Sequence, residues 1–225
     1  MLDYNLYLKY NMEVDLNVKN NFITPVDYVF AEILHETDEA VKNAGDDELP
    51  DATWIGFVYM MHYNQALAMD HGLTMTDFNE VTFSLIAKPL LDLDYTLMNE
   101  ETINAVGMAS NPNIMMLLHF GIVTRWQNKG IGEQALKGII RQMKGHCGYI
   151  IVRSQPPQHR EQNGPDSLYE KRGIQLAALE KDPEKAQLKL NAFFQRCGFK
   201  LFKDYPNIFV CNVDQVIPDR MMVKR

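Results

Sequence analysis

The residues best suited to chemistry lie where an apolar segment gives way to a helix-like one. Beyond Ile122 the chain reads Val-Thr-Arg-Trp-Gln-Asn-Lys-Gly-Ile-Gly, so Gly130 and Gly132 stand at the start of the expected helix. Glycines let a ligand approach the backbone closely, and unpaired N–H groups at a helix start attract a phosphate. Arg125 and Lys129 add positive charge. The junction therefore predicts a phosphate-binding turn.

Two pyrophosphate-bearing ligands suit such a turn. Gly130-x-Gly132-x-x-Ala135 satisfies the loose dinucleotide pattern, but six residues separate the apolar segment from its first glycine, where a dinucleotide turn is tight. The next predicted strand ends in Arg153-Ser154, without an acidic residue for the ribose. A nicotinamide-dependent oxidoreductase is thus the less favoured reading, and coenzyme A is the better candidate ligand.

A histidine stands close to this turn. His119 is the one titratable residue of the apolar segment, and a histidine pKa near 6.5 suits a general base. The alternative is a hydrogen-bonded histidine that supports a sheet. His62 is a weaker candidate base. The six histidines lack HxxxH spacing and a nearby cysteine partner, so no metal site is expected.

The elements that must position these residues can be read from hydrophobic periodicity. Residues 114–123 and Tyr149–Val152 read as buried strands, and 130–144 reads as an amphipathic helix between them. Together they predict one right-handed strand–helix–strand unit. Further helices are expected near 166–180 and 183–197, and a closing antiparallel strand pair at 199–202 and 208–213.

The first half of the chain is predicted to be largely helical. Thr24-Pro25 resembles a helix start, and apolar residues follow at helical spacing as far as Val41. Residues 64–106 also favour helices, interrupted at Gly72 and Pro89. Strands are expected at 2–8 and at Trp54–Met61, where aromatic and β-branched residues gather.

Composition and charge bound the function. The chain has 225 residues, 46% hydrophobic and 23% charged, which is typical of a soluble globular protein. No apolar segment is long enough for a membrane helix, no secretory signal pattern opens the sequence, and the three cysteines lack CxxC spacing, so a reducing cytoplasm is expected. Residues 1–110 hold 4 Lys/Arg against 19 Asp/Glu, and residues 111–225 hold 18 against 10. The net charge of −7 argues against nucleic-acid binding.

Two motifs resemble the GNAT superfamily of N-acetyltransferases. Gln127-Asn128-Lys129-Gly130-Ile131-Gly132 is similar to the family's Q/R-x-x-G-x-G/A motif, and Phe194–Phe199 resembles its later aromatic-x-x-x-Gly-Phe segment. The resemblance covers roughly residues 112–213. It implies an α/β fold with a splayed mixed β-sheet flanked by helices, preceded here by a helical N-terminal extension. Residues 112–225 would form the acetyl-CoA-binding core, and residues 1–111 the variable acceptor-binding part of the same domain.

The resemblance also implies a site. Backbone groups of Ile122 and Thr124 would pair with the pantetheine arm. Phe194 stands where many members carry a tyrosine that acts as general acid, and Gln187 stands where an asparagine often binds pantetheine. Amides of the turn would hold the pyrophosphate, namely those of Gln127, Asn128, Lys129, Gly130, Ile131 and Gly132.

The function that follows is transfer of an acetyl group from acetyl-CoA to an unidentified amine by direct attack, with His119 as the candidate base. The excess of acidic residues in the first half favours a cationic amine, either a small molecule or a peptide. The alternative is a non-catalytic acyl-CoA-binding or sensing module. Neither a membrane nor nucleic acid is expected as a partner, whereas a homodimer is compatible with the sequence.

Overall fold

A single mixed sheet organises the computed structural model, which describes residues 5–13, 26–36, 52–73, 90–91, 98–160, 168–202 and 205–216. The sheet has seven strands in the order β1-β2-β3-β4-β5-β7-β6. The strands are β1 (Asn5–Glu13), β2 (Val26–Glu36), β3 (Thr53–Tyr63), β4 (Ile114–Ile122), β5 (Tyr149–Arg153), β6 (Lys200–Leu201) and β7 (Ile208–Asn212). Strands β1 to β4 are antiparallel neighbours, β5 is parallel to β4, and β7 is antiparallel to β5 and to β6.

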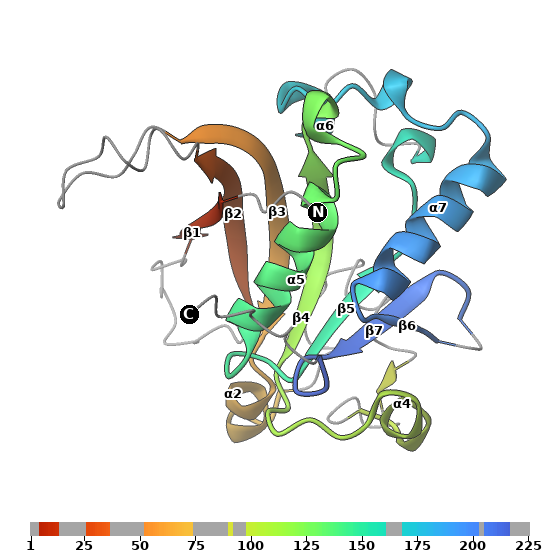
Figure 1. Ribbon diagram of the computed structural model, residues 1–225. Coiled ribbons are helices and arrows are strands. Elements are labelled where there is room, and N and C mark those ends of the chain that lie inside the picture. Colours follow the sequence, from red (N-terminus) through yellow and green to blue (C-terminus); the bar gives the residue numbers. More distant parts are fainter. Residues whose placement is uncertain are drawn as a thin grey trace, which may run out of the picture.

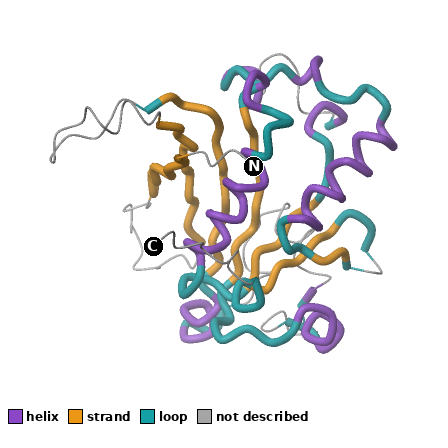
Figure 2. Tube along the Cα trace, viewed as in Figure 1, coloured by secondary structure: helices purple, strands orange, loops and turns teal. Residues whose placement is uncertain are grey.

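Helices flank this sheet (Figures 1 and 2). Helices α5 (Ile131–Met143) and α7 (Pro183–Arg196) pack on one face, in a core cluster that includes Leu136 and Phe194. Helices α2 (Gln65–Asp70) and α4 (Glu100–Val106) lie at the other face, where a second core cluster includes Ala68 and Val106. The prediction of an α/β fold with a mixed sheet flanked by helices is therefore confirmed.

The helix expected from Thr24 to Val41 is wrong over the described part, because Val26–Glu36 forms strand β2. Val29, Ala31 and Ile33 are buried while their described neighbours are less so, which is the alternation of a strand. Apolar residues in this segment fit both periodicities, and pairing with β1 on one side and β3 on the other decides between them.

The helical N-terminal extension is accordingly also wrong for the described residues, because β1, β2 and β3 extend the same sheet that contains β4. The described helices of the first half are the short α2 and α4. Thr24, Pro25, 37–41 and most of 74–97 lie outside the described residues.

The second half follows the sequence prediction more closely. Strands β4 and β5, helices α5 and α7 and the closing pair β6–β7 all form within a few residues of their expected bounds. The helix expected over 166–180 is instead the single turn α6 (Leu168–Lys171) followed by a 3₁₀ turn at Leu176–Ala178. Within the described ranges, none of the helices is both long and apolar enough to cross a bilayer.

Candidate functional site

An opening in the sheet is the feature that positions the candidate site. Strands β4 and β5 pair only from Ile114 to Leu117, although β4 continues to Ile122. The β3–β4 register shifts at this point, because Tyr59 is opposite His119 and the next residue of β3 is opposite Leu117. Leu118 is the extra residue of a bulge, and a bulge bends its strand. The two strands then diverge, as Figure 1 shows.

Two adjacent cavities occupy this opening. The outer chamber, of about 350 Å³, lies between the Gly130 turn, the loop at 156–158 and helix α7. The inner chamber, of about 50 Å³, lies deeper between β4 and β5 and is lined by Leu117, Val152 and Phe194 among others. Phe120, Pro157, Leu190 and Phe193 line both chambers.

Helix α7 supplies one wall of the outer chamber. Ala186, Lys189, Leu190 and Phe193 line it, and this spacing places all four on one face of a helix. The ring of Phe193 stacks on that of Phe120 from β4, with 5.9 Å between centroids. The helix begins at Pro183 behind Asp182, whose side chain accepts a hydrogen bond from the Lys185 N–H.

Helix α5 supplies the opposite wall and begins at the two glycines. Gly130 precedes the helix in a left-handed conformation, with φ of +80°. A Cβ placed on Gly132 would lie 3.6 Å from both Ile122 and Phe193, so a longer side chain there would enter the space beside these residues. At Gly130 and Gly132 the helix start therefore presents backbone to the outer chamber, beside the Glu133 side chain, and its dipole favours an anion.

The structure brings together six of the nine expected cofactor residues in the two chambers. Five line the outer chamber and Phe194 lines the inner one. Three lie elsewhere: the Lys129 ammonium is 4.9 Å from the ring centre of Trp126, Ile131 is buried in the core, and the Thr124 hydroxyl accepts a hydrogen bond from a backbone N–H of the α6 region. The five in the outer chamber are Ile122, Gln127, Asn128, Gly130 and Gly132.

Two side-chain amides are already used within the protein. The Gln127 Nε2 donates to the Ile122 carbonyl at 2.8 Å, so this carbonyl, expected to pair with pantetheine, already has a partner. The Gln187 Nε2 donates to Ser154 and to Asn191, at 2.9 Å to the Ser154 carbonyl. Gln187 is also not among the residues that line either chamber, so its expected contact with pantetheine is not supported.

His119 lies beside a tyrosine that sequence reasoning missed. The His119 Nδ1 is 3.4 Å from the Tyr169 hydroxyl, and the His119 ring stacks on Tyr59. Burial, aided by the positive charge of Arg160, lowers the pKa of His119 to about 4. The ring is therefore neutral at neutral pH.

Tyr169 lines the inner chamber and is only 3% exposed. Burial raises the pKa of its hydroxyl, whereas Arg160 and a hydrogen bond with the Phe120 backbone act in the opposite direction. The inner chamber thus ends at a protonated phenol that contacts a neutral imidazole. His62, the weaker candidate, is 3.9 Å from Asp27 and lines neither chamber.

Charges in the outer chamber are paired. Glu133 forms ion pairs with Lys137 at 2.9 Å and Arg196 at 3.1 Å. Burial raises the pKa of Glu133, but the two cations together outweigh it, so the pKa is lowered. Lys189 is likewise paired with Glu180. Binding of an anion here would therefore depend on the helix start more than on free cations.

Several lining residues could have been found from the sequence and others could not. The apolar face of 183–196 identifies Leu190 and Phe193 once a helix is assumed. Tyr169 follows a long polar loop and carries no local signal. No cluster of three metal-ligating side chains occurs in the described ranges. Comparison of the chain with protein-family models, with curated proteins and with solved structures gives no match to any of them.

Proposed function

We propose that this chain binds acetyl-CoA in the two chambers and transfers its acetyl group to an amine. The observation that carries the proposal is the opening between β4 and β5 directly beside a helix that begins at Gly130-Ile131-Gly132. The outer chamber, at about 350 Å³, falls within the range of small-molecule sites. The sequence resemblance to GNAT enzymes supports the same ligand.

The two chambers suit different parts of this ligand. The pyrophosphate would lie at the start of α5, where backbone N–H groups and the helix dipole favour negative charge. The pantetheine arm would follow the stacked rings of Phe120 and Phe193. The small inner chamber would take the thioester end, beside Phe194 and the Tyr169 hydroxyl.

The reaction would need one proton to move from nitrogen to sulfur. The amine nitrogen attacks the thioester carbon, the C–S bond breaks, and the coenzyme leaves as a thiolate that must gain a proton. We assign the proton donor to Tyr169, because Phe194 has no hydroxyl and Tyr169 lines the same chamber. Tyr169 would protonate the sulfur and, as a phenolate, regain a proton from the nitrogen as the amide forms. His119, with a pKa of about 4, is too weak a base to hold the proton of an ammonium, so it positions the Tyr169 hydroxyl and the amine enters as the free base.

Binding is tested by calorimetry with acetyl-CoA. Gly132→Glu places a long acidic side chain beside Ile122 and Phe193 and should abolish binding. Gly138→Glu is the matched control, because it introduces the same side chain into the same helix. Apart from the backbone of α5 itself, the atom nearest to a Cβ at this position is the tip of the flexible Arg141 side chain, at 3.9 Å. Equal affinity in both variants would contradict the proposed pyrophosphate position.

Turnover is tested with a panel of amines, from polyamines and lysine peptides to neutral amines. Tyr169→Phe should lower kcat by about 10²-fold with little change in KM, the usual scale for a positioned acid. His119→Gln, which keeps a hydrogen-bonding group, should lose less activity than His119→Ala. Tight acetyl-CoA binding without turnover of any amine would instead identify a non-catalytic acyl-CoA-binding module.

A further inference from the structure

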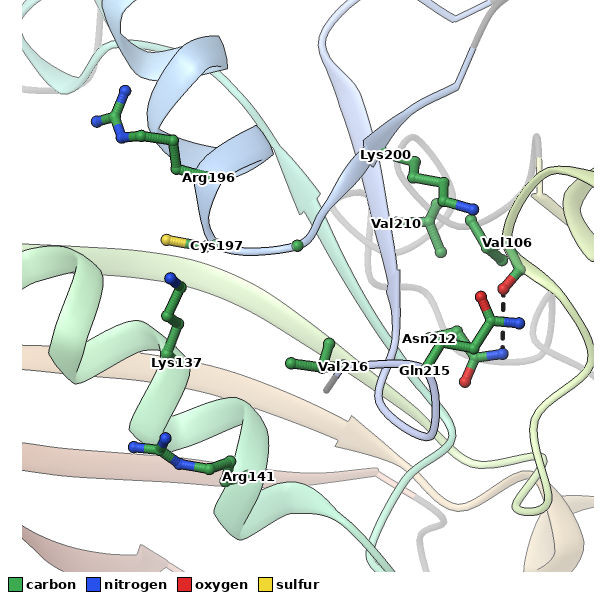
Figure 3. A pocket seen from close by; sticks show the side chains of 11 residues that line it. Val106, Lys137, Arg141, Arg196, Cys197, Lys200, Val210, Asn212, Gln215 and Val216 are labelled. Atoms are coloured by element: carbon green, nitrogen blue, oxygen red, sulfur yellow. Dashed lines mark hydrogen bonds between the residues drawn. The ribbon is translucent and has the colours of Figure 1, made fainter. Parts of the chain in front are cut away.

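A third cavity lies at the C-terminal ends of α5 and α7 and shares Arg196 with the outer chamber. This basic cavity has a volume of about 320 Å³ and is lined by residues of α4, α5, α7, β6 and β7 and the turn that follows β7. Figure 3 shows its side chains. Neither Gly130 nor Gly132 lines it, so the phosphate-binding turn is not part of this cavity.

Four cations from three elements surround the basic cavity: Lys137 and Arg141 from α5, Arg196 from the end of α7, and Lys200 from β6. No carboxylate is among the lining residues within the described part of the chain. Lys137 and Arg196 share one carboxylate, that of Glu133. Within the described part of the chain, these two cations therefore share the negative charge of Glu133.

The remaining two cations meet no carboxylate among the described residues. The Arg141 guanidinium makes no hydrogen bond or ion pair within the described part of the chain, and the residue is exposed. Among the described residues, the acceptor of the Lys200 ammonium is the uncharged carbonyl of Ala105, at 3.0 Å. The outer chamber differs, because its two lining cations pair with carboxylates that line the same chamber. Lys189 pairs with Glu180, and Arg196 pairs with Glu133. The basic cavity therefore carries the greater local excess of positive charge.

The cavity also has an apolar side. Val106, Val210 and Val216 line it together with the cations, and in Figure 3 Val216 lies between Lys137 and Lys200. The Asn212 amide beside them donates to the carbonyls of Val106 and Gly107, so its N–H groups are already used. An occupant would meet apolar surface in the middle and positive charge at the rim.

We propose that the basic cavity binds a small organic anion that has an apolar body and a phosphate or carboxylate group. Favourable interaction with helix dipoles accounts for Arg141 and Arg196, which lie in last helical turns, but not for Lys200 on a strand. Anion binding accounts for all four cations and for the apolar wall. Arg196 lines both cavities, so an anion that recruits it would compete with Glu133.

Calorimetry at low ionic strength tests this site with three probes: phenyl phosphate, benzoate and inorganic phosphate. Phenyl phosphate or benzoate should bind at or below about 1 mM, and inorganic phosphate should bind more weakly because it lacks the apolar body. The stronger of the two organic probes identifies the acidic group. Absence of binding by both, or equal binding of inorganic phosphate, would overturn the proposal.

Variants locate the probe. Arg141→Glu and Lys200→Glu should each weaken binding by about tenfold or more, whereas Lys171→Glu, the same charge change on the exposed α6, should not. Gly132→Glu should leave probe binding unchanged. If it removes the probe, the anion binds at the start of α5 and the basic cavity is not its site. Because acetyl-CoA is not a probe here, this result is independent of the proposed function.

Discussion

His119 links a buried ring to the pH dependence of the fold. Its pKa is lowered from 6.5 to about 4 in the folded protein, so only the unfolded chain takes up the proton as pH falls through this interval. Stability should therefore decline from about pH 6.5 to about pH 4, by roughly 2 kcal/mol after allowing for the partial exposure of the ring. His62, whose pKa burial also lowers, acts in the same direction.

Urea unfolding of the parent and of His119→Gln at several pH values measures this effect. Glutamine does not titrate, so the variant should lose less stability on acidification than the parent does. Identical slopes for the two proteins would show that His119 has an ordinary pKa in the folded state.

Phe193 and Phe194 are adjacent but have different roles. Phe194 is 4% exposed and packs against Phe199 and Phe209, so Phe194→Ala should cost about 3–5 kcal/mol of stability. Phe193 is half-buried over the cleft, and Phe193→Ala should destabilise less but weaken acetyl-CoA binding more. Thermal melts and calorimetry on both variants check this, and the reverse order would show that Phe194 contributes more to ligand binding than Phe193 does.

At the scale of elements, the turn into β5 depends on the absence of a side chain at Gly148. A Cβ there would lie 1.9 Å from the Asn111 carbonyl oxygen and 2.6 Å from the Ala109 side chain. Since the first of these is backbone, Gly148→Ala should destabilise the protein by about 3 kcal/mol. Gly138→Ala, inside α5 with open space around it, should stabilise slightly. Chemical denaturation compares the two.

Helix α5 and strand β5 could be predicted from the sequence because each has one dominant periodicity. The apolar stripe of α5, which includes Ala135, Leu136 and Ile139, is fully buried as expected. The segment 26–36 could not be assigned in this way, because its apolar residues fit both helical and strand periodicity. Pairing with β1 and β3 determines that it forms a strand. Local sequence does not determine which distant segments pair as strands.

The candidate site shows the same limit. Gly130 and Gly132 could be found from the sequence, because the conformational freedom of glycine is a property of the single residue. The Tyr169–His119 contact joins residues 50 positions apart and needed the packed structure. The neutral charge state of His119 follows from burial, which the sequence does not report.

For the whole molecule, the cysteines give a simple measure of integrity. Cys147, Cys197 and Cys211 are all buried, and burial raises the pKa of each thiol to about 12. Because the thiolate is the reactive form, a thiol reagent such as Ellman's should react very slowly with the native protein. In denaturant all three should react at once. Fast modification of one thiol in the native state would contradict its burial.

The bulge at Leu118 has a consequence for how such an opening can arise. On β4, Met115, Leu117, Phe120 and Ile122 lie on the α5 side, so the alternation would be strict if Leu118 were left out of the count. Leu118 therefore behaves as a one-residue insertion that leaves every other side chain on its face. Deletion of Leu118 should preserve the core, and a cooperative thermal melt would show this. Strand β4 should become straighter and close against β5, so the proposed acetyl-CoA binding should be lost. Lengthening one strand by one residue can thus open a sheet locally while the other side chains of that strand keep their faces.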